Sequence, residues 1–95
     1  MCEPSDQLAF VSIDGRRLPH SHAELICAQW GWQVELHGVP PGSCPLVRQV
    51  GEITLATENE DRCAGTVIAD LVSDDGFVLL SGIGHLRLIA FADAA

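Results

Sequence analysis

The residue types best suited to chemistry in this sequence stand close together in residues 20–24 (HSHAE). If this run is extended, His20, His22 and Glu24 point to the same side, because side chains alternate along a strand with a period of two. Two imidazoles and a carboxylate are suitable ligands for a divalent transition metal such as zinc, iron, nickel or manganese. The favoured interpretation needs no cofactor and makes these histidines surface or capping residues beside Pro19; the alternative is a metal site at His20, His22 and Glu24, which His37 or His85 from another strand could complete.

The same run admits a second interpretation, in which residues 21–30 form one short helix. Ser21 followed three residues later by Glu24 matches a capping box, and Gly31 stands where a helix-ending glycine would. On a helix, His22 and Glu24 would lie on different faces and the ligand set would be lost. The sequence leaves helix and strand open, because short apolar segments fit both patterns.

The run from Gly15 to Gly31, with its two histidines and its glutamate, resembles the first metal-binding motif of the cupins. Residues 40–42 (PPG) resemble part of the second motif. Four residues separate Gly15 from His20 and one separates His22 from Glu24, fewer in both places than in that family. The resemblance implies a small cupin-like barrel that binds a metal or a small ligand through the histidines and the glutamate.

Trp30 and Trp32 flank Gly31 and would share one face of a strand. Such a pair can stack on a sugar, a base or an aromatic ligand. The chain has only two tryptophans and three phenylalanines, so its largest side chains are needed in the core. Core packing is therefore the favoured interpretation, and ligand stacking by the two tryptophans is the alternative.

The other candidate motifs favour structural interpretations. Cys44 lies in a loop rich in proline and glycine and is expected to be exposed, but no motif supplies a base for it. Residues 82–84 (GIG) lack the third glycine and the following helix of a dinucleotide-binding loop. The acidic turns at 58–61 and 74–75 do not have the spacing of a calcium-binding loop. No catalytic residue is predicted.

Composition limits the classes of partner. Five arginines, no lysine and thirteen acidic residues give a net charge of −8. Nucleic acids and anionic lipids are bound largely through basic residues, so we expect neither as a partner. The first six residues lack the basic and then apolar order of a signal peptide, which predicts a cytoplasmic protein. The four cysteines, at 2, 27, 44 and 63, include no C-x-x-C pair.

The elements that must position these residues are predicted to be short strands joined by tight turns. Asp14-Gly15 is typical of a type I′ hairpin turn. The predicted strands are 8–13, 32–36, 52–57, 63–72, 77–80 and 86–91, with a loop at 37–45. Six to seven short strands in 95 residues predict one mainly β domain, an antiparallel barrel or sandwich, with a possible helix at 21–30.

Both faces of the last predicted strands are apolar. In 86–91, Leu86 and Leu88 lie on one side, whereas Ile89 and Phe91 lie on the other. A barrel has one interior, so a second surface must cover the outer face, and a second copy of the chain is the simplest cover. The sequence therefore predicts a non-catalytic binding or interaction module that acts as a homodimer. A protein or small-molecule partner is not identified.

Overall fold

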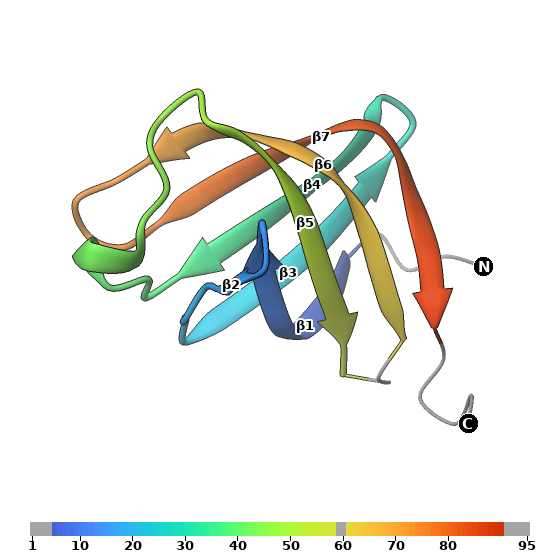
Figure 1. Cartoon of the computed structure of the whole chain (residues 1–95), viewed down its shortest axis with the longest axis horizontal. Helices are drawn as coiled ribbons and strands as arrows, with labels where there is room; N and C mark the ends of the chain where they lie inside the picture. The colour runs from blue at the N-terminus through green and yellow to red at the C-terminus, as the bar shows by residue number, and fades with distance from the viewer. Residues whose placement is uncertain (1–4, 59–60, 91–95) are drawn as a thin grey trace.

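The computed structural model describes residues 5–58 and 61–90 (Figure 1). Strands occupy most of these residues, and the remaining regular element is one 3-10 turn. In chain order the elements are β1 (Ser5–Ile13), β2 (Arg16–Arg17), β3 (His22–Ala28), β4 (Gly31–His37), η1 (Pro41–Ser43), β5 (Val50–Thr57), β6 (Arg62–Val72) and β7 (Val78–Ala90). Among the described residues, no helix is long and apolar enough to cross a membrane.

The strands form one antiparallel sheet that closes into a barrel. The order is β2-β1-β3-β4-β7-β6-β5, and the pairing of β1 with β5 joins the six long strands into a ring. The short β2 pairs only with β1 and lies outside this ring (Figure 1). Closure gives each barrel strand a hydrogen-bonded neighbour on both sides. The predicted mainly β barrel is thus confirmed.

The β1–β2 hairpin has the predicted turn. Asp14 and Gly15 both have positive φ, at 52° and 81°, and Ile13 pairs with Arg16 as the closing pair. These are the properties of a type I′ turn. The turn is also tied to β5, because the Asp14 N–H donates to the Glu52 carbonyl oxygen at 2.8 Å and Asp14 Oδ1 accepts from the Glu52 N–H at 2.9 Å.

Residues 22–28 are a strand, so the helix considered for 21–30 is not formed. Ala23 and Leu25 are buried, and every residue from His22 to Ala28 pairs with a residue of β4. Ser21 makes no capping box, because its N–H and its hydroxyl both donate to the His37 carbonyl oxygen. Pairing with β4 over the full strand therefore overrides the local helix signal.

The predicted break between two strands at 82–84 is wrong, since β7 is continuous from Val78 to Ala90. Thr66 pairs with Ile83 and Ala64 with Arg87, so a step of two residues along β6 faces a step of four along β7. Gly84 supplies the positive φ, 75°, within this bulge. A bulge bends its strand, and β7 turns sharply between its two halves (Figure 1). Phe91 lies outside the described residues.

Alternating side chains of the barrel strands fill the interior. The largest side chains that are almost wholly buried are Leu36, Ile53, Leu55, Leu80, Val11, Val34, Val39, Val67 and Val78. Trp32, at the start of β4, packs against Gly65 and Gly82, where any Cβ would lie 2.8 Å or less from the indole. Its Nε1 donates to the Gly84 carbonyl oxygen at 2.9 Å.

Candidate functional site

Two of the three residues predicted to bind a metal are in contact. His22 and Glu24 share the outer side of β3, and His22 Nε2 lies 3.0 Å from Glu24 Oε1. His37 pairs with His22 across the β3–β4 ladder, with 5.8 Å between the ring centroids. His22 and Glu24 thus lie on one side of a strand, as the strand interpretation predicts.

His20 is not part of this cluster. It precedes β3, and its Nδ1 lies 2.9 Å from the Leu18 carbonyl oxygen. Within the described part of the chain, no three histidine, cysteine or acidic side chains are grouped closely enough to hold a metal ion. Metal binding by His20, His22 and Glu24 stays a prediction, and it would require the His20 ring to move closer to the other two side chains, with Nε2 as its ligand atom while Nδ1 stays on the Leu18 carbonyl oxygen. His85 is exposed near the opposite end of the barrel, in β7.

The two tryptophans differ in their surroundings. Trp32 is 5% exposed and belongs to the core, whereas Trp30 is 66% exposed at the β3–β4 turn. The core interpretation is therefore correct for Trp32 and wrong for Trp30, because Trp30 lies in the two-residue turn between Ala28 and Gly31 and not on a strand. An open cleft of about 530 Å³ runs beside this turn and is lined by both tryptophans, Gln29 and His85 among others. Of the pair predicted to stack on a ligand, Trp30 has its ring accessible.

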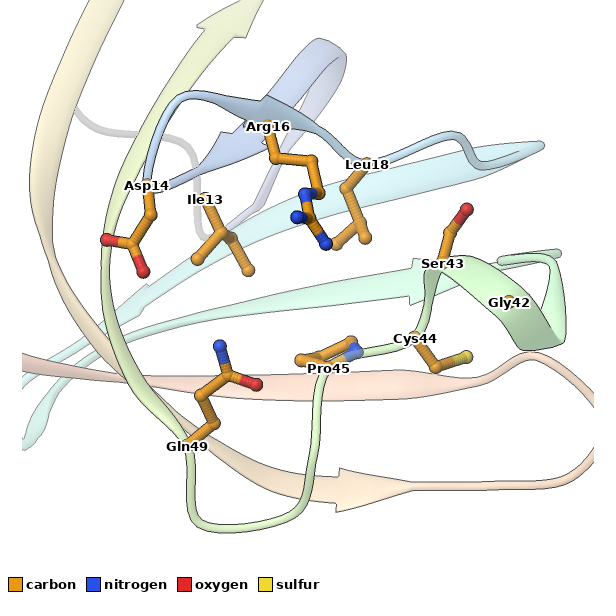
Figure 2. Close-up of a pocket in the computed structure, with 9 residues that line it drawn as sticks. All are labelled: Ile13, Asp14, Arg16, Leu18, Gly42, Ser43, Cys44, Pro45 and Gln49. Atoms are coloured by element: carbon orange, nitrogen blue, oxygen red, sulfur yellow. The ribbon is translucent and has the colours of Figure 1, made fainter.

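A more enclosed pocket of about 260 Å³ lies at the other end of the barrel (Figure 2). We call it the hairpin pocket, because the β1–β2 hairpin forms one side of it through Ile13, Asp14, Arg16 and Leu18. Residues 42–45 and Gln49, from the connection between β4 and β5, form the other side. The mouths of β-barrels are common positions for small-molecule sites. The Asp14–Glu52 hydrogen bonds hold this hairpin in place against β5.

The polar side chains that line the hairpin pocket include two nitrogen donors, Arg16 and Gln49, besides Asp14, Ser43 and Cys44. Gln49 Oε1 accepts from the Leu46 N–H at 3.0 Å, which leaves the Gln49 Nε2 group to face the pocket, as Figure 2 shows. The Arg16 side chain extends from β2 toward the opposite wall (Figure 2). No acidic side chain in the described ranges lies within the 4.0 Å ion-pair distance of Arg16. The pocket therefore contains a guanidinium group and an amide N–H group that can receive a ligand.

Cys44 also lines the hairpin pocket. Its thiol was expected to be exposed, but the residue is half-buried and packs against the core. The sulfur lies 3.6 Å from the Pro40 carbonyl oxygen and 3.9 Å from that of Val39. Carbonyl oxygens are acceptors and cannot take the thiol proton, so these contacts do not activate a nucleophile.

Aliphatic side chains gather on the outside of the last three strands. We call this surface the outer β5–β7 face and define it by Val50, Ile68, Leu71, Leu79, Ile83 and Ile89. Register brings most of these residues together, since Val50 pairs with Ile68 and Leu71 pairs with Leu79, whereas Ile89 lies beyond the bulge of β7. Ile83 pairs with Thr66 and is thus a diagonal neighbour of Ile68.

Four members of the outer β5–β7 face are well exposed, with 54% for Val50, 45% for Leu71, 46% for Ile83 and 52% for Ile89, whereas Ile68 and Leu79 are partly buried. Polar groups are interspersed among them. Glu52 lies 3.9 Å from Arg87 Nη2 and accepts a hydrogen bond from Thr66, and Asp70 accepts one from Ser81. This surface matches the expectation that the late strands are apolar on both sides.

The turn between β6 and β7 contains a carboxyl group with a lowered pKa, that of Asp75. The Ser73 hydroxyl lowers the pKa of Asp75 below its usual value of 3.8, and the Phe77 N–H and the charge of His37 act in the same direction. The Phe77 N–H lies 3.3 Å from Asp75 Oδ1. Hydrogen bonds to the ionised form favour that form, so this carboxylate stabilises the turn when it is charged.

Comparisons with known proteins give no assignment: no family model, no curated protein and no solved structure matches this chain. The resemblance to the cupins therefore rests on the motif residues alone. Sequence reasoning missed Arg16 and Gln49 as possible ligand-binding residues. They are 33 positions apart in the sequence and come together only because the hairpin contacts β5. No local pattern in the sequence indicates that contact.

Proposed function

We propose that this chain is a non-catalytic interaction module that works as a symmetric homodimer, with the outer β5–β7 face as the contact surface. The observation that carries the proposal is the group of half-exposed aliphatic side chains on strands whose inner sides already form the core. Large exposed apolar patches are typical of interaction surfaces. A surface of this kind can be covered by an identical surface related by a two-fold axis.

Charge supports a second copy at this surface. The chain has a net charge of −8, so two copies repel each other in most orientations. Within β5–β7 themselves Arg62 and Arg87 balance Glu52 and Asp70, whereas the acidic Glu58, Asp61, Asp74 and Asp75 lie in the turns at the strand ends. Approach through this region therefore meets less repulsion than approach elsewhere. Opposite charges in one patch can also pair across a two-fold axis.

The energies are those of a concentration-dependent dimer. Burying the exposed half of one aliphatic side chain contributes about 1 kcal/mol. Four such side chains per copy, with smaller contributions from Ile68 and Leu79, give roughly 8–10 kcal/mol gross for a dimer, against an association cost of about 4–15 kcal/mol. The net value corresponds to a dissociation constant in the micromolar range or weaker. Dimerisation should therefore depend on protein concentration.

Light scattering coupled to size-exclusion chromatography tests the proposal over a range of concentrations. We expect a mass that rises from the 10.2 kDa of one chain toward twice that value. Ile83→Glu should keep the protein monomeric, because it buries a charge at the contact. Trp30→Gln is the matched control, since it removes an exposed apolar side chain at the β3–β4 turn. A mass of one chain at every concentration would refute the proposal, as would dissociation by Trp30→Gln alone.

A further inference from the structure

We propose that the hairpin pocket binds a small monocarboxylate with an apolar body, a binding activity separate from the dimer proposed above. The pocket presents one guanidinium group, Arg16, and one amide donor, the Gln49 Nε2 group. A guanidinium group has a planar pair of N–H donors that matches the two oxygens of a carboxylate. The Gln49 Nε2 group can donate a further hydrogen bond to the same carboxylate from the other side of the pocket.

The remaining walls define the rest of the ligand. Ile13, Leu18 and Pro45 line the pocket with apolar groups, and Leu18 is 5% exposed. A volume of about 260 Å³ is smaller than the pockets that hold drug-sized molecules. The occupant is therefore a compact molecule with an apolar part, of about ten non-hydrogen atoms or fewer.

Asp14 sets the charge of the ligand. Its Oδ1 is held by the Glu52 N–H, and its Oδ2 lies against Gly51, so the carboxylate stays at the edge of the pocket. The Asp14 charge weakens the attraction of Arg16 for every anion, and its repulsion is twice as large for a doubly charged anion as for a singly charged one. A monocarboxylate is consequently preferred over inorganic phosphate.

Titration of the ¹⁵N-labelled full chain with sodium benzoate, followed by amide spectra at constant ionic strength, tests the proposal. We expect saturable shifts that are largest within residues 13–18 and 42–49. Arg16→Gln should weaken binding about 10- to 100-fold, because it removes a charged donor from the carboxylate. Arg17→Gln is the matched control: Arg17 is the next residue in β2 and lies over the Phe10 ring, 5.5 Å from its centroid. It should leave binding within about twofold of the original.

Two further measurements keep the outcome decisive. Gln49→Leu removes the amide donor and should also weaken benzoate binding about tenfold. This variant tests the pocket even if Arg16→Gln does not fold. Benzoate should slow alkylation of Cys44, measured by peptide mass, with Cys27 and Cys63 as references outside the pocket. The absence of saturable shifts, or shifts centred elsewhere, would overturn the proposal. Equal binding of neutral benzamide, tighter binding of inorganic phosphate, or equal loss in the Arg16 and Arg17 variants would do the same.

Discussion

Gly82→Ala should be among the most destabilising single-methyl changes in this barrel. A Cβ at position 82 would lie 2.1 Å from Trp32 Cε2, 2.4 Å from Cδ2 and 2.5 Å from Nε1. The neighbouring pairs of the β4–β7 ladder, Gln33 with Ser81 and Val34 with Leu80, hold both backbones in place. The strands cannot separate without losing these hydrogen bonds, so the indole ring must move instead.

The cost follows from what Trp32 loses when its ring is displaced. Removing a buried tryptophan side chain costs about 3–5 kcal/mol, and partial displacement costs a large part of this. The hydrogen bond from Nε1 to the Gly84 carbonyl oxygen contributes about 1 kcal/mol more. We therefore expect Gly82→Ala to lower the free energy of unfolding by roughly 3 kcal/mol, out of the 5–15 kcal/mol typical of a small domain.

Urea denaturation followed by far-ultraviolet circular dichroism measures this loss, at one protein concentration so that self-association does not vary. Two glycines serve as matched controls, since a Cβ added at either would meet no atom within 4 Å beyond its chain neighbours. Gly84→Ala carries a φ of 75° and should cost about 1 kcal/mol, whereas Gly42→Ala has no positive φ and should cost close to nothing. In a Trp32→Leu background the cost of Gly82→Ala should fall below about 1 kcal/mol, because the ring that it meets is gone. An effect of Gly82→Ala equal to that of Gly42→Ala, or one unchanged by Trp32→Leu, would refute the reasoning.

Two further predictions concern the turns. Gly15→Val should lower the free energy of unfolding by about 1–2 kcal/mol or more, because a β-branched residue resists the φ of 81°. Gly15→Asn should lower it less, because asparagine accepts positive φ more readily. Equal urea midpoints for the two variants would contradict the turn assignment. Asp75→Asn should be less stable than the original chain at neutral pH. Folding lowers the pKa of Asp75, so the ionised carboxylate contributes fully to the free energy of unfolding above pH 3.8, and this contribution is lost as the pH falls through the lower folded pKa. The stability difference between the original chain and Asp75→Asn should therefore disappear in strong acid. A difference that stays constant from neutral pH into acid would contradict the assignment.

The parts of the fold that the sequence predicts well are those with a local physical cause. The Asp14-Gly15 turn was predictable because few dipeptides accept positive φ at both central positions. The alternation in β4, with Trp32, Val34 and Leu36 inward, appears directly in the order of apolar and polar residues. A barrel then follows from many short strands with tight turns between them.

The wrong or undecided parts depend on residues far apart in the chain. Residues 21–30 satisfy helix-capping rules, and only pairing with β4 decides for a strand. The glycines of 82–84 have the pattern of a strand break, yet Gly82 is required by the Trp32 ring, 50 positions away in the sequence. Trp30 and Trp32 were expected to share an environment, but Trp30 lies in the exposed β3–β4 turn whereas Trp32 lies on β4 in the core. In each case the local pattern alone does not determine the outcome.

Both proposals depend on an arginine in an otherwise acidic chain: Arg16 in the hairpin pocket and Arg87 on the outer β5–β7 face. Nucleic acids and anionic membranes need many basic groups spread over one surface. Here Arg16 shares the hairpin pocket with Asp14 and is proposed to bind one small anion, whereas Arg87 lies 3.9 Å from Glu52 among aliphatic side chains. The hairpin pocket and the outer β5–β7 face share no residue. Ile83→Glu should therefore leave benzoate binding intact, and Arg16→Gln should leave the mass of the dimer unchanged. If either variant abolished both properties, the two surfaces would have to be coupled through the barrel, and the assignment of separate roles to the arginines would be wrong.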